Sequence, residues 1–373
     1  MQRHARLVLS TLALLLLAAA AAWGGATPAP LELLKGPYLQ SVTSETIAIM
    51  WETSEPSDSR VYYGLTPEYT DCVREATVTE LHEIVLTGLE RDTHYHYRVT
   101  SVREDETASC EDSTFDTAVA PEMGFRFVVY GDTRSNPTDH ADVVAGIVAS
   151  RPRFVAHTGD FVAQGKEYWR WQSEYFNPAA VLMKNTTLFP CLGNHEQNSQ
   201  WYYYFFRTPA GGGDYEEQWY SFDYGNCHFA IVDTDVDFSP GSDQHAWLEG
   251  DLESARAELV FVIHHHPAYS SGAHGGCEEV QKHLVPLYET CGIDMVFSGH
   301  DHIYERSYKD GVYYVVSGGG GAPVYDCDQK PNPYHQYCEK THHFCTVDVD
   351  GKRIRMQARH SNGAVFDSIE LKH

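Results

Sequence analysis

The chain has 373 residues, of which 42% are hydrophobic, 13% aromatic and 21% charged, which excludes a disordered tail, a coiled coil and a short disulfide scaffold. The length predicts two globular domains. The formal net charge of -25 repels nucleic acid polymers and anionic membranes, but it does not exclude small phosphorylated substrates, because bound metal ions reverse the field inside a cleft.

The first segment is typical of a signal peptide. Arg3 and Arg6 precede an apolar run over residues 7–23, and small residues follow at 24–26. The run falls short of the ~20 residues that a membrane span needs, although a membrane anchor is the alternative. We expect residues 1–26 to be cleaved and the mature chain to be secreted or periplasmic, with no membrane span left.

All nine cysteines follow residue 26. An exported chain meets conditions that allow disulfides, and an odd count leaves at least one thiol unpaired. Cys327 and Cys338 bracket a loop rich in Pro and Asp, and Cys72 and Cys110 fall in the same N-terminal domain. These are the preferred pairs, although spacing does not determine connectivity.

Residues 35–118 are predicted to form an all-β domain. Short runs with alternating apolar residues are separated by Pro, Gly, Ser and Asp, at 46–51, 60–63, 84–86 and 95–102. Short strands with turn signals about every ten residues indicate a β-sandwich. Trp51 is then expected in the core.

Residues 125–373 are predicted to form an α/β domain. Apolar runs at 125–130 and 154–158 flank a segment with helical spacing at 139–150, which predicts a strand, helix, strand crossover with parallel strands. Further strands are expected at 188–192, 220–223, 227–233, 260–264, 295–298, 312–317, 344–349 and 354–360. The strands form one large mixed sheet or two sheets.

Oxygen and imidazole ligands gather at or just after the ends of these strands, where α/β sheets build their sites. They are Asp132, Asp160, Asn194 with His195, the histidines at 264–266, and His300 with His302. A set without thiolates favours Zn, Mn or Fe(II), and it is larger than one ion can use.

In order and approximate spacing, these segments resemble the calcineurin-like metallophosphoesterases. The motifs are Gly131-Asp132, Gly159-Asp160, Gly193-Asn194-His195-Glu196, His265 before Pro267, and Gly299-His300-Asp301-His302. The preceding sandwich, with GPYLQSV and a segment LERDTHYHYRV that resembles a fibronectin type III tyrosine corner, makes the whole chain similar to the purple acid phosphatases. The resemblance implies an α/β (α+β) four-layer metallophosphoesterase sandwich, preceded by an all-β fibronectin type III-like sandwich.

The resemblance also implies two metal ions, as divalent or iron-type cations (Fe, Zn or Mn). The ligands carried over are Asp160 as the bridge, Asp132 and His302 on the first ion, and Asn194, His265 and His300 on the second. Asp suits the bridge, because a carboxylate has two oxygens and can bind two cations about 3.5–4 Å apart.

Two ligands that occur in related enzymes are missing. The purple enzymes have a tyrosine three residues after the bridging Asp, where this chain has Ala163, so no tyrosinate–Fe(III) centre is expected. Other metallophosphoesterases have a His at the position of Arg134, which cannot ligate a metal. The fourth ligand of the first ion is therefore water or His140. Arg134 is expected to hold a phosphate oxygen, and a structural salt bridge is the alternative.

The implied function is that of a secreted, acid phosphatase-like phosphoric ester hydrolase, in which a metal-bound hydroxide attacks phosphate monoesters directly. His195 and His274 are candidates to bind phosphate or protonate the leaving group. Glu196 and Asp301 are expected to orient imidazoles. A phosphodiesterase or nucleotide pyrophosphatase with the same centre is one alternative, and a non-catalytic extracellular binding protein is another. Natural substrate, metal identity and oligomeric state stay open.

Overall fold

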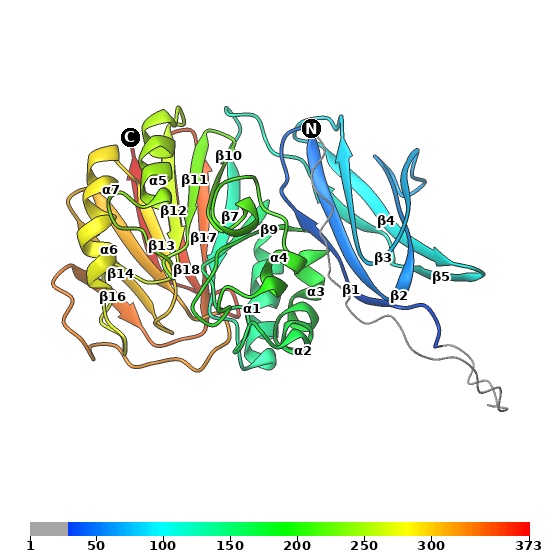
Figure 1. Ribbon diagram of the computed structural model, residues 1–373. Coiled ribbons are helices and arrows are strands. Elements are labelled where there is room, and N and C mark those ends of the chain that lie inside the picture. The colour runs from blue at the N-terminus through cyan, green and yellow to red at the C-terminus, as the bar shows by residue number, and fades with distance from the viewer. Residues whose placement is uncertain (1–28) are drawn as a thin grey trace, which may run out of the picture. The chain divides into compact units, whose positions relative to one another are not determined.

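The structure, a computed structural model, describes residues 29–373, and the predicted signal peptide at 1–26 lies outside the described residues. Residues Leu31–His373 form one compact unit (Figure 1). Within the described part of the chain, every helix is too short or too polar to cross a bilayer.

The N-terminal part is all β, as predicted. Its strands are β1 (Leu33–Gln40), β2 (Thr46–Gly64), β3 (Asp71–Thr87), β4 (His94–Arg103), β5 (Glu106–Ser109) and β6 (Ser113–Asp116). The two strands predicted at 46–51 and 60–63 are one strand, β2. The pairing of β2 with β3 shifts in register on both sides of Ser57, in the polar middle of β2. Before this point β2 pairs with β1 and β3, and after it β2 pairs with β3 and β4.

The side chains expected to mark this domain have the predicted environments. Trp51 is fully buried, and its indole Nε1 donates to Ser101 Oγ at 2.9 Å. The hydroxyl of Tyr95 accepts a hydrogen bond from the backbone N–H of Glu90 at 2.9 Å, which is the contact that defines a tyrosine corner.

The predicted crossover is present. Strand β7 (Phe125–Tyr130), helix α1 (Pro137–Ser150) and parallel strand β8 (Phe154–His157) follow in order. Helix α1 begins after Asn136, whose side chain accepts from the backbone of Asp139. Strand β9 (Thr187–Pro190) extends the sheet beside β8, after the short helices α2 (Tyr168–Arg170) and α3 (Asn177–Met183) and the π-helix η1 (Trp171–Phe176) between them.

The first sheet has twelve strands and runs through both parts of the chain. Its order is β19-β18-β17-β7-β8-β9-β1-β2-β4-β5, with β3 on β2 and β6 on β4. Gln40 of β1 pairs in parallel with Leu188 of β9 and so joins the N-terminal strands to the rest. Strands β17 (His343–Asp350), β18 (Arg353–His360) and β19 (Val365–Lys372) form the other edge.

The second sheet has seven strands in the order β10-β11-β12-β13-β15-β14-β16. They are β10 (Tyr220–Tyr224), β11 (Cys227–Val232), β12 (Leu259–His264), β13 (Met295–Ser298), β14 (Tyr304–Lys309), β15 (Val312–Ser317) and β16 (His335–Glu339). Helices α4 (Gln200–Phe205), η2 (Asp214–Glu216), α5 (Asp243–Ser254), α6 (Glu278–His283) and α7 (Val285–Cys291) complete the elements. Of these strands, β14 and β16 were not predicted, because they are polar and pairing with a neighbour forms them rather than an apolar run. Strand β19 of the first sheet was also not predicted, since its apolar residues are interrupted by polar ones.

The expected four layers are present (Figure 1). Between the sheets, the ring of Phe127 lies 5.1 Å from that of Phe229 and 5.2 Å from that of Phe261, centroid to centroid. Val128, the next residue of β7, faces the opposite way and packs with α1 and α3. On the outer face of the second sheet, Val262 packs with α5, α6 and α7. This alternation of strand side chains leaves one helical layer outside each sheet.

One predicted disulfide is confirmed and the other is wrong. Cys327 and Cys338 are bonded. Cys72 and Cys110 are both free, because their sulfurs have different neighbours: Arg74 Nε donates to the first, and the backbone N–H of Val99 donates to the second.

Candidate metal centre

The candidate ligands lie on loops that leave the ends of parallel strands in both sheets. Asp132 follows β7, Asp160 follows β8 and His300 follows β13. These three residues have φ angles of 57°, 60° and 70°, in the left-handed region that residues other than glycine rarely adopt. Such conformations persist where the surrounding structure imposes them, and they cluster at functional sites.

The glycines of the motifs allow the loops to approach closely. A Cβ on Gly299 would lie 2.3 Å from Asp132 Oδ2, and one on Gly193 would lie 2.5 Å from Asp160 Oδ1. Any side chain at these two positions would therefore displace a candidate ligand.

Asp132, Asp160 and His302 form one group, in which each residue offers a ligand atom within 4.8 Å of the other two. The Nδ1 of His302 donates to the carbonyl oxygen of Pro323 at 2.8 Å, so its Nε2 carries the lone pair, 3.6 Å from Asp132 Oδ1. Arg134 borders the group, since its Nε donates to Asp160 Oδ2 at 3.2 Å and its Nη2 lies 3.3 Å from His302 Nε2.

His265, Asn194 and His300 form a second group beside Asp160. The Nδ1 of His265 donates to the carbonyl oxygen of Thr158 at 2.8 Å, so its Nε2 is unprotonated in the neutral ring. That nitrogen lies 3.0 Å from Asn194 Oδ1, 3.2 Å from His300 Nδ1 and 3.4 Å from Asp160 Oδ1.

This donor set fits bound cations. Burial holds the pKa of His265 well below its usual value, so the ring is neutral and the lone pair of its Nε2 faces the amide oxygen of Asn194. Burial and then the repulsion from Asp160 raise the pKa of Asp132 well above its usual range. Converging lone pairs and two buried carboxylates destabilise each other unless a positive ion lies between them.

His195 and His274 border the two groups. The Nδ1 of His195 donates to the carbonyl oxygen of Ala163 at 2.7 Å, and its Nε2 lies 3.9 Å from Asp160 Oδ2. His274 is exposed, and its ring centroid lies 4.3 Å from that of His300. Both side chains thus lie where a small molecule bound at the site would contact them.

The prediction that Glu196 and Asp301 orient imidazoles is wrong. The buried carboxylate of Glu196 accepts from the backbone N–H groups of Asp160, Phe161 and Gly193, each at 2.8 Å. Asp301 accepts from Ser270 Oγ and from the backbone N–H groups of His274 and Gly275. Buried loops carry backbone donors that strand pairing does not satisfy, and these two carboxylates accept from them.

The structure places His140 away from the candidate ligands. Its Nδ1 lies 3.1 Å from the carbonyl oxygen of Glu174, and its Nε2 lies 3.4 Å from the hydroxyl of Tyr130. Water is therefore the remaining alternative for the fourth ligand of the first ion. The other two histidines of the triplet have different places. Neither ring nitrogen of His264 has a hydrogen-bond partner among residues 29–373. The ring of His266 lies 4.4 Å from that of His300, centroid to centroid, but its Nδ1 contacts Thr234 Oγ1 at 2.9 Å.

Two residues at the site were not predicted. Glu174 Oε2 accepts from the backbone N–H groups of Ser135 and Ala163 and so ties together the loops that carry Asp132 and Asp160. The backbone N–H of Tyr325 donates to the carbonyl oxygen of His302 at 2.9 Å, and its ring stacks on that of His302 at 4.3 Å. Neither residue lies in a motif. The one signal in the sequence is that Tyr325 stands two residues before Cys327.

Comparison with known protein families gives two matches. Residues 125–304 match the model of the calcineurin-like phosphoesterases, and residues 36–117 match that of the purple acid phosphatase N-terminal domain. These matches confirm the resemblance found in the sequence.

Similar curated proteins include purple acid phosphatase 18 of Arabidopsis thaliana, which is 26% identical over 86% of this chain and 82% of its own length. Acid phosphatase type 7 of Danio rerio is 26% identical over 74% of this chain and 72% of its own. Probable inactive purple acid phosphatase 9 of Arabidopsis thaliana is 27% identical over 42% of this chain and 30% of its own.

Among solved structures, a purple acid phosphatase from yellow lupin (Lupinus luteus) seeds superimposes with a TM-score of 0.77 at 18% identity. The match covers 90% of this chain and 74% of that one. A structure of PhoD gives a TM-score of 0.67 at 11% identity and covers 90% of this chain and 88% of that one. At these identities the likeness shows a shared fold.

Proposed function

Because this chain belongs to the calcineurin-like phosphoesterases and carries a purple acid phosphatase N-terminal domain, it is a metal-dependent phosphoric ester hydrolase, and we propose that its substrates are phosphate monoesters. We further propose that the enzyme is secreted and acts with two metal ions. The observation that carries the two-metal proposal is the gathering of six candidate ligands from five loops into two groups that both include the carboxylate of Asp160.

The proposed ligands divide between two positions. Asp132 and His302 would hold the first ion, Asn194, His265 and His300 would hold the second, and Asp160 would serve both. The placement of His302 Nε2 beside Asp132, and of His265 Nε2 beside Asn194 and His300, supports this division. Two bound cations supply Lewis-acid chemistry, since they acidify an attacking water and offset charge on the phosphate oxygens.

Arg134 is proposed to bind the substrate phosphate. The ion pair with Asp160 is the structural alternative, and it uses the Nε donor. Nη2 also lies 3.3 Å from His302 Nε2 and Nη1 donates to Ser135 Oγ at 3.5 Å, but the guanidinium has five N–H donors in all. Its side chain is also 17% exposed at the edge of the site. The remaining donors match a phosphate oxygen pair, which a planar guanidinium binds well.

His195 and His274 are proposed to handle the leaving group. The Nδ1 proton of His195 is held by the carbonyl oxygen of Ala163, so only Nε2 is available to bind a phosphate oxygen or to deliver a proton. His274 lies beside His300 on the exposed side, which suits contact with the departing alkoxide.

The test compares Asp160→Ala with Asp105→Ala, a matched substitution at an exposed turn of the N-terminal domain. We expect Asp160→Ala to lower kcat for phenyl phosphate by about a hundredfold or more, because the shared ligand is lost. Elemental analysis should find two metal ions per wild-type chain and fewer in Asp160→Ala. Unchanged turnover and metal content in that variant would refute the mechanism.

A paired assay decides between ester classes. The same chromogenic phenol is offered as its phosphate monoester and as its phosphate diester. Faster turnover of the monoester supports the proposal, whereas faster turnover of the diester supports the phosphodiesterase alternative. Loss of both activities in excess chelator is expected for a metal-dependent site.

A further inference from the structure

A loop closed by the disulfide lies against the candidate metal centre. We call residues 325–338, which contain the Cys327–Cys338 bond, the disulfide loop. At its start, Tyr325 stacks on His302. The ring of Tyr325 also lies 5.8 Å from that of His274, centroid to centroid. The disulfide loop therefore borders the same side of the site as His274, the side proposed for the leaving group.

Buried hydrogen bonds fix the disulfide loop in place. The fully buried carboxylate of Glu305 accepts from Asn332 Nδ2 at 2.8 Å, contacts His335 Nδ1 at 2.8 Å, and accepts from the backbone N–H of Ser271 at 2.5 Å. The backbone N–H groups of Gln329 and Lys330 donate to the carbonyl oxygen of Ser271. The disulfide loop is thus docked on the segment 270–276, which carries His274.

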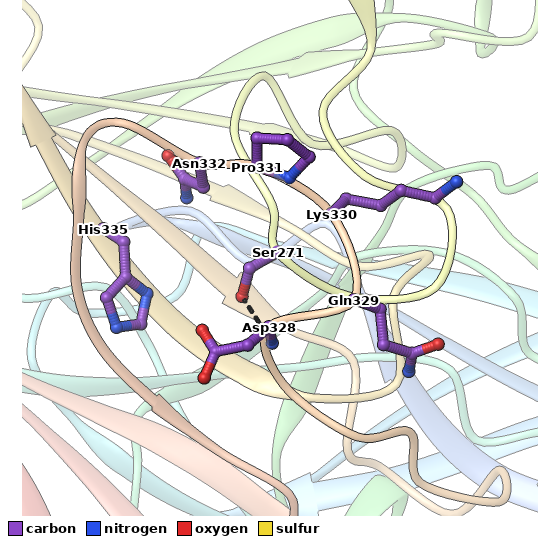
Figure 2. Close-up of a pocket in the computed structure, with 7 residues that line it drawn as sticks. All are labelled: Ser271, Asp328, Gln329, Lys330, Pro331, Asn332 and His335. Carbon is purple, nitrogen blue, oxygen red and sulfur yellow. Dashed lines mark hydrogen bonds between the residues drawn. The ribbon is translucent and has the colours of Figure 1, made fainter.

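Lys330 is the one lysine or arginine of the disulfide loop, and its side chain lies against the docked segment. A Cβ on Gly275, the residue after His274, would lie 3.2 Å from Lys330 Cγ, so the lysine stem passes directly over Gly275. Figure 2 shows the ammonium group pointing away from Asp328, its acidic neighbour in the loop. Lys330 is exposed, and no ion pair joins it to any residue in the range 29–373.

A cavity of about 450 Å³ opens beside this lysine (Figure 2). Its lining contains both charges of this stretch, Lys330 and Asp328, and the other lining residues are Ser271, Gln329, Pro331, Asn332 and His335. Arg134, the cation beside His302, already pairs with Asp160, whereas no ion pair joins Lys330 to another residue of the described structure.

We propose that Lys330 is a specificity-determining residue, which selects phosphate esters whose leaving group carries a second negative charge, a carboxylate or another phosphate. This inference rests on the proposed function. An unpaired cation fixed beside the leaving-group side attracts such a substrate in a chain whose net charge is -25. Because the ammonium is exposed, the effect is roughly two- to fivefold in kcat/KM and weakens with added salt.

The experiment measures kcat/KM for three esters: phenyl phosphate, 4-carboxyphenyl phosphate and 1,4-phenylene bisphosphate. The quantity compared is the kcat/KM of each charged ester divided by the kcat/KM of phenyl phosphate. Lys330→Gln is expected to lower this ratio roughly two- to fivefold and Lys330→Glu to lower it further. Lys352→Gln is the matched control, since Lys352 is an exposed lysine that pairs with Glu258.

The outcomes separate the two proposals. If the wild type hydrolyses none of the three esters, the proposed function fails. If it hydrolyses them and the ratio is unchanged in Lys330→Gln and Lys330→Glu, or falls equally in Lys352→Gln, the role of Lys330 fails. A fall in the ratio that is confined to the Lys330 variants and lost at high salt supports the inference. A fall with only one charged ester identifies the group that Lys330 selects.

Discussion

Backbone carbonyl groups decide which imidazole nitrogen faces the candidate centre. In His265, His302 and His195, Nδ1 donates to a carbonyl oxygen, of Thr158, Pro323 and Ala163 respectively. Since a carbonyl oxygen only accepts, each ring must carry its proton on Nδ1 and present Nε2 to the site. The loops therefore fix the tautomers, and the carboxylates of Glu196 and Asp301 are left to hold the loops themselves.

A different histidine gives the clearest pH dependence of stability. Burial by itself lowers the pKa of His228, but hydrogen bonds to Asp223 at 2.7 Å and Asp251 at 2.8 Å outweigh it and raise the pKa to about 9. A pKa raised by folding stabilises the protein fully below the ordinary pKa of ~6.5 and loses this effect as the pH rises through the folded value.

We therefore expect His228→Gln to lower the free energy of unfolding by about 1–2 kcal/mol at pH 6. This value allows for the solvent screening of the His228–Asp223 interaction, because Asp223 is largely exposed. The difference from the wild type should disappear near pH 10. Urea unfolding at several pH values measures it, with His94→Gln, an exposed histidine that pairs with Asp116, as the control. A difference that does not change with pH would contradict the assignment.

At the scale of elements, loops rather than strands carry the site, and buried carboxylates from other segments hold several of them. Glu174 of η1 joins the loops after β7 and β8, and Glu305 of β14 holds the disulfide loop. A strained loop keeps its conformation only where such contacts over-determine it. The disulfide adds a covalent closure to the loop that carries Lys330.

Removal of this closure should affect substrate binding more than turnover. The bond links cysteines 11 residues apart, and closing a loop of this size stabilises a protein by about 3 kcal/mol. We expect the double variant Cys327→Ser/Cys338→Ser to unfold at lower urea and to show a higher KM for 4-carboxyphenyl phosphate with a smaller change in kcat. Cys72→Ser, at an exposed free thiol, is the control. An unchanged KM would show that the docked contacts suffice without the bond.

At the scale of the whole molecule, the N-terminal strands and the α/β part share one hydrophobic core and one sheet. Trp51 and Tyr97 belong to the same buried cluster as Phe127 and Phe261. At the junction, the buried ammonium of Lys35 pairs with Glu52 and contacts the hydroxyl of Tyr168 at 2.8 Å. Burial lowers the pKa of Lys35, so its charge depends on the partners that surround it.

Breaking this pair on one side should be costly. Lys35→Met leaves the carboxylate of Glu52 buried without its cation, and we expect the free energy of unfolding to fall by about 3–5 kcal/mol. The double variant Lys35→Met/Glu52→Leu should lose less, because no unpaired charge remains. Lys372→Met, at the exposed pair with Glu370, should change it by less than about 1 kcal/mol. Equal losses in the single and double variants would argue against a buried, coupled pair.

The sequence by itself determined the order of most elements and predicted which residues lie together at the candidate centre. Buried strands appear as apolar runs, and the motifs at their ends contain Asp132, Asp160, Asn194, His265, His300 and His302, all of which the structure brings together. Cys327 with Cys338 and the core position of Trp51 were also predictable, since short loops and alternating strands are local properties of the chain.

The tertiary structure decided the rest. The free thiols of Cys72 and Cys110, the backbone contacts of Glu196, and the places of Tyr325 and Lys330 depend on segments far apart in the sequence. Periodicity and residue preference act between neighbours along the chain, so they fix where strands and helices form. The partner of a buried polar group is whichever group packing brings within hydrogen-bond distance, and that is decided only when the layers come together.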